Sequence, residues 1–158
     1  MLPIEDIKFH FEHTQEGDQT IVRLSGSIDE DAKFDELMSL GKKMVFNFKE
    51  VTSINSCGIR NWVNFIKELD AVIYYAECPP VIVRQLNMVP SFKGKADVVS
   101  VEIPYVCDAC EKEKVVLVHK DKFQGGNVQV SELITCDACG KEEMEFDGHP
   151  EQYFAFAK

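Results

Sequence analysis

Apolar and polar residues follow two different periods along the first two thirds of the chain, and each period predicts one type of element. Short apolar runs bounded by turn residues predict strands, whereas apolar positions three or four residues apart predict helices. The predicted strands cover residues 7–13, 20–25, 44–48, 71–76 and 98–103. The predicted helices cover residues 34–41, 55–69 and 79–89.

This order of elements predicts an α/β fold. Strands that alternate with helices form a sheet with mixed pairing, and the helices cover at least one of its faces. The best boundary lies before Pro104, which divides the chain into residues 1–103 and 104–158. No low-complexity linker separates the two parts, so we expect them to pack together or to share a continuous strand.

The second part is predicted to be small and rich in β-structure. Apolar runs at 115–118, 128–134 and 143–146 predict strands, and Gly125 and Gly126 predict a turn between the first two. The aromatic end of the chain, with Tyr153, Phe154 and Phe156, predicts a last strand or part of a dimer contact.

Four of the six cysteines form two Cys-x-x-Cys pairs in the second part. Cys107 and Cys110 make the first pair, and Cys136 and Cys139 make the second, each within the repeated letters Cys-Asp-Ala-Cys. This pattern predicts a zinc ribbon in which the four thiolates bind one Zn²⁺ tetrahedrally. Four thiolates leave no position for water, so we expect the zinc to stabilise the small second part and not to catalyse a reaction.

Composition and charge narrow the class of partner. The 158 residues include 17 Lys and Arg against 27 Asp and Glu, which gives a formal net charge of −10. Such a chain repels phosphate backbones and anionic lipids, so we expect a protein partner and neither nucleic acid nor a membrane. The start of the chain lacks an apolar signal-peptide core, so the expected location is the cytoplasm. No phosphate-binding glycine loop or catalytic triad is readable, so no enzymatic activity is expected.

A second informative segment runs from a predicted buried strand into the predicted helix at Asn55. Asn55 is predicted to cap this helix, which places Ser56 at its exposed N-terminus, where an anion meets free backbone amides. A phosphate on Ser56 would add about −1.5 to −2 charges and reorganise a docked partner. The next residue, Cys57, is predicted to be a small buried residue beneath the helix, with a reactive thiol as the alternative.

These residues resemble the motif of the STAS domain, the family of bacterial anti-sigma factor antagonists. The family pattern Asp-x-x-x-Val-x-x-x-Asp-Ser-Ser-Gly is matched by Asn47, Val51 and the run from Asn55 to Gly58. The segment Leu24-Ser-Gly-Ser-Ile-Asp29 resembles an earlier family segment, and the resemblance covers roughly residues 5–103. Both family Asp positions hold Asn here, and Cys57 replaces the second Ser.

The resemblance implies a cytoplasmic regulatory module that docks a protein partner, an anti-sigma factor kinase in the family. It makes Ser56 the candidate phosphoacceptor. The expected partner-binding residues are Asn55, Ser56, Cys57, Gly58 and Arg60, the last of which follows Ser56 by one helical turn and is placed to pair with its phosphate.

Three alternatives stay open from the sequence. Asn55 and Ser56 can form a helix cap without any phosphorylation. The zinc ribbon can serve as a stabiliser or as a second contact surface, including one for a homodimer. The thiols of Cys57 or of the ribbon can report oxidants, which makes a zinc-thiolate redox sensor the alternative function.

Overall fold

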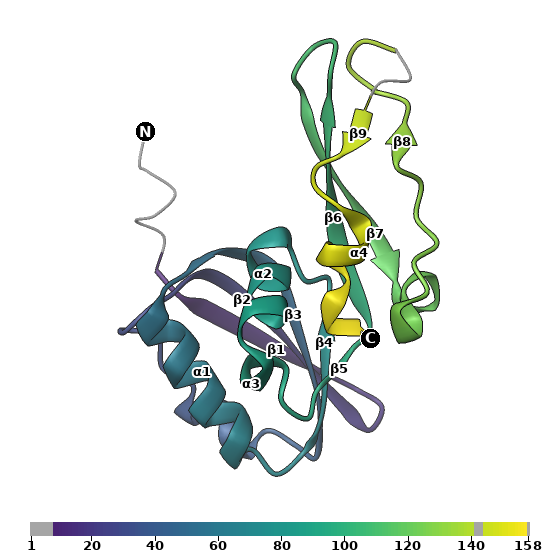
Figure 1. Ribbon diagram of the computed structural model, residues 1–158. Coiled ribbons are helices and arrows are strands. Elements are labelled where there is room, and N and C mark those ends of the chain that lie inside the picture. Colours follow the sequence, from purple (N-terminus) through teal and green to yellow (C-terminus); the bar gives the residue numbers. More distant parts are fainter. Residues whose placement is uncertain (1–7, 141–143, 158) are drawn as a thin grey trace.

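A mixed five-stranded sheet lies at the centre of the first part of the chain (Figure 1). The computed structural model describes residues 8–140 and 144–157, so the predicted strand ends at residues 7 and 143 lie outside the described residues. The strand order is β1-β2-β3-β4-β5. β1 pairs antiparallel with β2, and β2 to β5 are parallel, which confirms the predicted α/β class with mixed pairing. These strands are β1 (His10–Glu16), β2 (Gln19–Ile28), β3 (Lys43–Ile54), β4 (Val72–Ala76) and β5 (Asp97–Val98).

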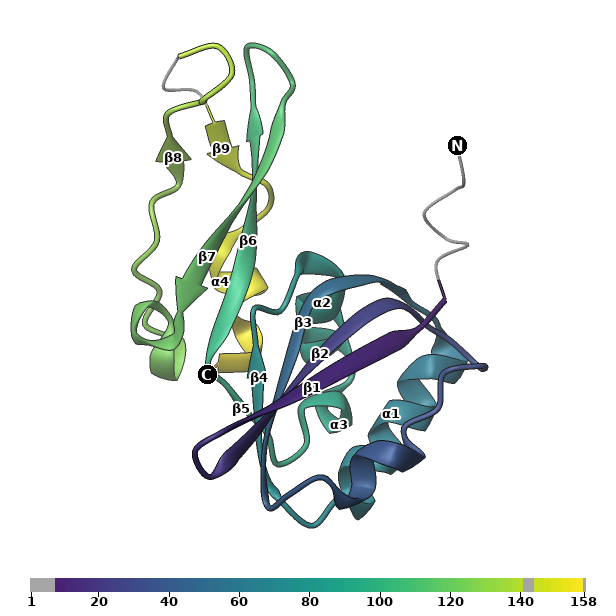
Figure 2. The same cartoon turned by 180° about the vertical axis from the view of Figure 1, so that it is seen from behind.

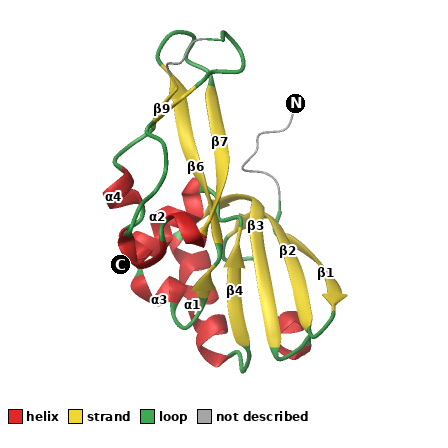
Figure 3. Ribbon diagram, turned by 90° about the vertical axis from the view of Figure 1, so that its right-hand side faces the viewer, coloured by secondary structure: helices red, strands yellow, loops and turns green. Residues whose placement is uncertain are grey.

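The helices lie on one face of this sheet (Figure 3). They are the 3₁₀ helix η2 (Asp35–Ser39), α1 (Ser56–Glu68), α2 (Pro80–Met88) and α3 (Pro90–Lys93). The predicted helix over 34–41 is thus only a short 3₁₀ segment, and it buries Leu37 alone among its five residues. Helix α2 begins with Pro80 and ends before Pro90, in agreement with the place of proline at helix starts.

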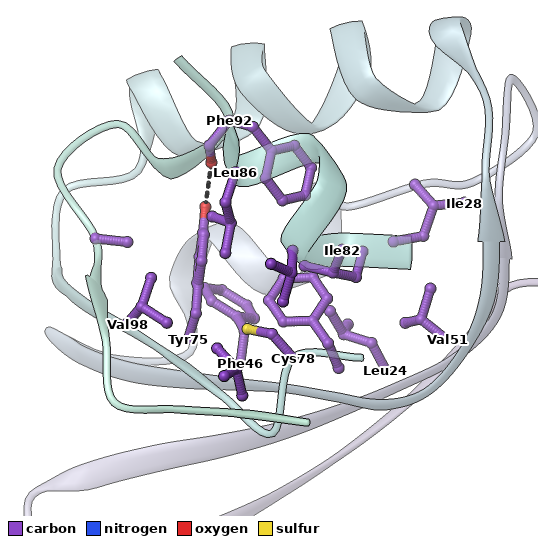
Figure 4. Packing of buried hydrophobic residues seen from close by; sticks show 14 of the residues in the cluster. Leu24, Ile28, Phe46, Val51, Tyr75, Cys78, Ile82, Leu86, Phe92 and Val98 are labelled. Carbon is purple, nitrogen blue, oxygen red and sulfur yellow. Dashed lines mark hydrogen bonds between the residues drawn. The ribbon is translucent and has the colours of Figure 1, made fainter. Parts of the chain in front are cut away.

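Trp62 is the centre of the core beneath α1. Its ring makes edge contacts with Phe34 and Phe46 at centroid distances of 5.0 and 5.1 Å. Its indole N–H donates to the hydroxyl of Tyr75 over 3.0 Å. That hydroxyl donates to the carbonyl of Phe92 over 2.7 Å, the bond drawn as a dashed line in Figure 4. Burial raises the pKa of Tyr75, so the hydroxyl stays protonated and joins α1, β4 and α3.

A second, antiparallel sheet forms the C-terminal part, in the order β7-β6-β9-β8. Its strands are β6 (Ser100–Cys107), β7 (Glu113–His119), β8 (Leu133–Ile134) and β9 (Met144–Phe146). The strand predicted over 128–134 is therefore formed only at its last two residues. The short helices η3 (Lys120–Lys122) and η4 (Gln124–Gly126) follow β7, where the glycines predict a turn.

β6 connects the two sheets. Near the end of β4, Cys78 forms a parallel bridge with Val101, and the N–H of Glu102 donates to the carbonyl of Cys78 over 2.7 Å. The same strand then continues past Pro104 to Cys107, where it pairs with β7 and β9. The position between residues 103 and 104 thus lies within a continuous strand, and the division of function between residues 1–103 and 104–158 stays a prediction.

The aromatic end of the chain is helical, which corrects the predicted last strand. α4 (Pro150–Tyr153) and η5 (Ala155–Ala157) pack against α2. Asn87 of α2 holds them through both ends of its amide: Nδ2 donates to the carbonyl of Tyr153 over 2.9 Å, and Oδ1 accepts from the N–H of Phe156 over 2.8 Å. Phe154 is fully buried and stacks on Phe123 at 5.0 Å. The aromatic side chains therefore fill the junction between the two parts.

Candidate functional site

Asn55 builds the first candidate site, the N-terminal end of α1. Its backbone is extended, and its Oδ1 accepts a hydrogen bond from the N–H of Gly58 over 2.8 Å, which confirms the predicted cap. Its Nδ2 donates to the carboxylate of Glu30 over 3.0 Å. This hydrogen bond lowers the pKa of Glu30. An aspartate at position 55 has no such donor, so the amide explains why Asn occupies this position of the motif.

Asn47 repeats this arrangement at the other departure from the motif. Its Nδ2 donates to the carboxylate of Glu77, and its Oδ1 accepts from the N–H of Lys49 over 2.9 Å. Glu77 has a positive φ of 50°, which is an uncommon backbone conformation for this residue type. At both positions an amide–carboxylate hydrogen bond thus replaces the repulsion that an aspartate would have with the neighbouring glutamate. The sequence alone does not indicate Glu30 or Glu77 as partners.

Gly58 allows α1 to begin directly against the end of β2. A Cβ atom at this position would lie 2.0 Å from the carbonyl oxygen of Ile28. The N–H of Asn55 also donates to that oxygen over 3.2 Å. Gly58 is buried, so its part in the site is to permit this close approach.

The exposed side chains of the first helical turn are Ser56, Cys57 and Arg60. The prediction that Cys57 lies buried beneath the helix is wrong, because Gly58 occupies the position that faces the sheet. The neighbouring loop carries Glu30 and Asp31, both exposed. The helix end therefore combines the positive end of the helix dipole and the cation of Arg60 with an acidic neighbour.

The four paired cysteines form the second candidate site. Their Sγ atoms all lie within 4.8 Å of one another, and two of the distances, Cys107 to Cys139 and Cys110 to Cys136, are 3.6 Å. A tetrahedral ion with Zn–S bonds of about 2.3 Å requires sulfur separations of about 3.8 Å. The sulfur atoms therefore fit such an ion with small adjustments. The two cysteine-bearing turns lie side by side at the tip of the second sheet (Figures 1 and 2).

The two turns have the same backbone geometry. The N–H of Glu111 donates to the carbonyl of Cys107, and the N–H of Gly140 donates to the carbonyl of Cys136, both over 2.8 Å. Both donors have positive φ, 62° at Glu111 and 76° at Gly140. The repeated sequence Cys-Asp-Ala-Cys thus forms the same type of turn twice. The left-handed position that ends each turn holds Glu111 in the first turn and glycine, Gly140, in the second.

The thiols of this cluster differ in acidity. The N–H groups of Cys139 and then of Ala138 lower the pKa of the Cys136 thiol to about 7. The N–H of Lys112 acts to lower the pKa of Cys110, but desolvation and hydrogen bonds with the other sulfurs outweigh it and raise this pKa to about 12. The backbone N–H groups of the second turn thus favour a thiolate at Cys136, and a bound cation would favour the thiolate form of all four cysteines.

Comparison with known proteins finds similarity among solved structures only. No protein-family model matches the sequence, and no curated protein matches it. Among solved structures, the chain is similar to an anti-sigma factor antagonist from Mycobacterium paratuberculosis, with 14% sequence identity and a TM-score of 0.48. The similarity covers 58% of this chain and 85% of that one. Separately, none of the helices in the described part of the chain is long and apolar enough to cross a membrane.

Proposed function

We propose that this protein is a cytoplasmic regulatory module that docks a protein partner through the N-terminal end of α1. The observation that carries this proposal is the exposure of Ser56, Cys57 and Arg60 on one capped helix end, within a motif that resembles the STAS pattern. Residues 1–103 would carry the docking surface, and residues 104–158 would carry a structural zinc site.

Phosphorylation of Ser56 would act on the contact between Asn55 and Glu30. The positive end of the helix dipole and Arg60 favour a phosphate at this helix end, whereas the carboxylate of Glu30 opposes it. A phosphate would therefore weaken the hydrogen bond that joins α1 to the loop after β2. The loop after β2 could then move away from α1, and this movement would couple phosphorylation of Ser56 to release of the partner.

The test compares Ser56→Ala with Ser56→Asp in a pull-down from the native cell, together with intact mass before and after phosphatase. Ser56→Ala should retain the partner and Ser56→Asp should lose it, while both variants keep the unfolding midpoint of the parent within error. Arg60→Ala should lower the stability of the phosphorylated protein more than that of the unphosphorylated protein, because Arg60 is placed to pair with the phosphate. Equal capture by Ser56→Ala and Ser56→Asp would show that the helix end is only a cap.

The proposed cofactor is one Zn²⁺ held by Cys107, Cys110, Cys136 and Cys139. The support is the separation of the four sulfur atoms and the repeated turn geometry. Bound zinc would supply cross-linking of the two turns and no open coordination position. Metal analysis of the purified protein should find one zinc per chain, and Cys107→Ser should abolish it.

A further inference from the structure

The four clustered cysteines divide by exposure as well as by sequence. Cys107 and Cys136, the first cysteine of each turn, are only 1% exposed, whereas Cys110 and Cys139, the second of each turn, are exposed. Each turn thus has one exposed cysteine and one buried cysteine. A tetrahedral zinc site does not itself require this division.

The short sulfur contacts link the two classes across the turns. Cys110, exposed, lies 3.6 Å from Cys136, buried, and Cys139, exposed, lies 3.6 Å from Cys107, buried. The sulfur of each exposed cysteine is therefore in van der Waals contact with the sulfur of a buried cysteine of the opposite turn. In a two-step thiol oxidation, an accessible sulfur is attacked first and a nearby sulfur resolves it.

We propose that this cluster is an oxidation site for hydroperoxides, which converts the four thiolates into the disulfides Cys110–Cys136 and Cys107–Cys139. The inference rests on the proposed zinc site, because bound zinc keeps the four cysteines in the thiolate form. It does not depend on docking of a partner through α1. It assigns Cys110 and Cys139 as the attacked sulfurs and Cys136 and Cys107 as the resolving sulfurs.

The chemistry balances for each pair. The exposed thiolate attacks one oxygen of the hydroperoxide, the O–O bond breaks, and one proton is taken up, so that a sulfenic acid and an alcohol (or water) form. The buried thiolate then attacks the sulfenic sulfur, the S–O bond breaks, and water leaves with a second proton. The two sulfurs lose two electrons and the peroxide gains them.

The structural consequence is an exchange of one cross-link for another. A disulfide cannot supply its two former thiolate ligands, so bound zinc is released. The two new bonds still join the turn after β6 to the turn after β8, and the tip keeps its connection. Disulfides within each turn would instead leave the two turns without any covalent or metal link.

The remaining two cysteines are poor sites for the same reaction. Cys78 is fully buried, and burial raises the pKa of its thiol. Cys57 is exposed, but no contact with another sulfur is found for it within the described residues. Cys57 therefore provides a built-in control for oxidation without a resolving partner.

The experiment treats the full zinc-loaded chain with hydrogen peroxide and measures released zinc with a chelating dye and disulfides by mass spectrometry. A protease that cleaves before aspartate separates the two cysteines of each turn, because Asp108 and Asp137 lie between them. We expect four thiols lost per zinc released, the two cross-turn disulfides, and full reversal by dithiothreitol. Cys57→Ser should release zinc at the parental rate.

Disulfides Cys107–Cys110 and Cys136–Cys139, or zinc retained while only Cys57 is oxidised, would overturn the proposal. Absence of zinc from the purified chain would refute the proposed zinc site. The disulfides that peroxide forms in the reduced, metal-free chain would still test the proposed cross-turn pairing. Docking of a partner through α1 is tested separately, by partner capture with the Ser56 variants.

Discussion

The substitution Gly58→Ala tests whether the glycine of the motif is required by packing. Ala is the better helix former by about 1 kcal/mol, so on propensity alone this change within α1 would stabilise the protein. The structure predicts the opposite sign, because the new Cβ would lie 2.0 Å from the carbonyl oxygen of Ile28. Carbon–oxygen contacts are normally about 3.3 Å or longer, so the helix start would have to move by about 1.3 Å.

Three terms set the magnitude of this effect. Overpacking of a well-packed site costs about 3 kcal/mol at the upper end of its usual range. The shift also strains the bond from the N–H of Gly58 to Asn55, and a lost cap costs about 1 kcal/mol. The gain in helix propensity offsets about 1 kcal/mol of this. We therefore expect the free energy of unfolding to fall by about 3 kcal/mol.

Urea unfolding measures this change, with fluorescence of the single tryptophan, Trp62, as the probe. Trp62 lies in the core one turn further along the same helix, so its emission reports on the affected region. The matched control is Cys57→Ala, an exposed neighbour that should change stability by no more than about 0.5 kcal/mol. A Gly58→Ala protein as stable as the parent, or more stable, would refute the close approach of α1 and β2.

Three further predictions concern the second sheet and its junction. Chelation of zinc should unfold the cysteine-bearing tip, seen as a loss of β-structure by circular dichroism, while Trp62 fluorescence stays unchanged; a concerted loss of both signals would contradict this. Glu111→Gly should raise stability by about 1 kcal/mol in thermal unfolding, because Glu111 holds a φ of 62° where its counterpart is Gly140. Burial raises the pKa of Glu102, with a smaller contribution from the nearby Glu77, so its ionisation opposes folding. Stability should fall as pH rises from the normal glutamate pKa through this raised value, and Glu102→Gln should flatten that part of the pH–stability profile.

Local patterns in the sequence were sufficient for most elements of the first sheet. The cap at Asn55, the start of α2 at Pro80 and the buried strands all follow from residue types at fixed spacing. The pairing of Asn47 with Glu77 and of Asn55 with Glu30 could not be predicted, because these partners are 30 and 25 residues apart in sequence. The replacement of Asp by Asn was the visible signal, and it becomes interpretable only when the neighbouring carboxylates are placed.

The errors have physical causes of the same kind. Cys57 was predicted to be buried because lone cysteines often are, but its orientation depends on which residue of the first turn faces β2, and that residue is Gly58. The composition of the aromatic end of the chain predicts a last strand or part of a dimer contact. It forms helices whose backbone groups bond to Asn87, more than 60 residues earlier, and this contact is not visible in the local sequence.

Because β6 belongs to the second sheet and is also bridged at Val101 to Cys78, just after β4, its length is restricted in a way that the length of an ordinary linker is not. Inner side chains at Val101, Ile103, Tyr105 and Cys107 alternate with outer ones along the strand. Insertion or deletion of one residue would turn every later side chain to the opposite face, so that the sulfur of Cys107 would point away from the other three. Natural variants of this chain should therefore change the length of this strand by even numbers of residues, and tolerate odd changes only in the turns.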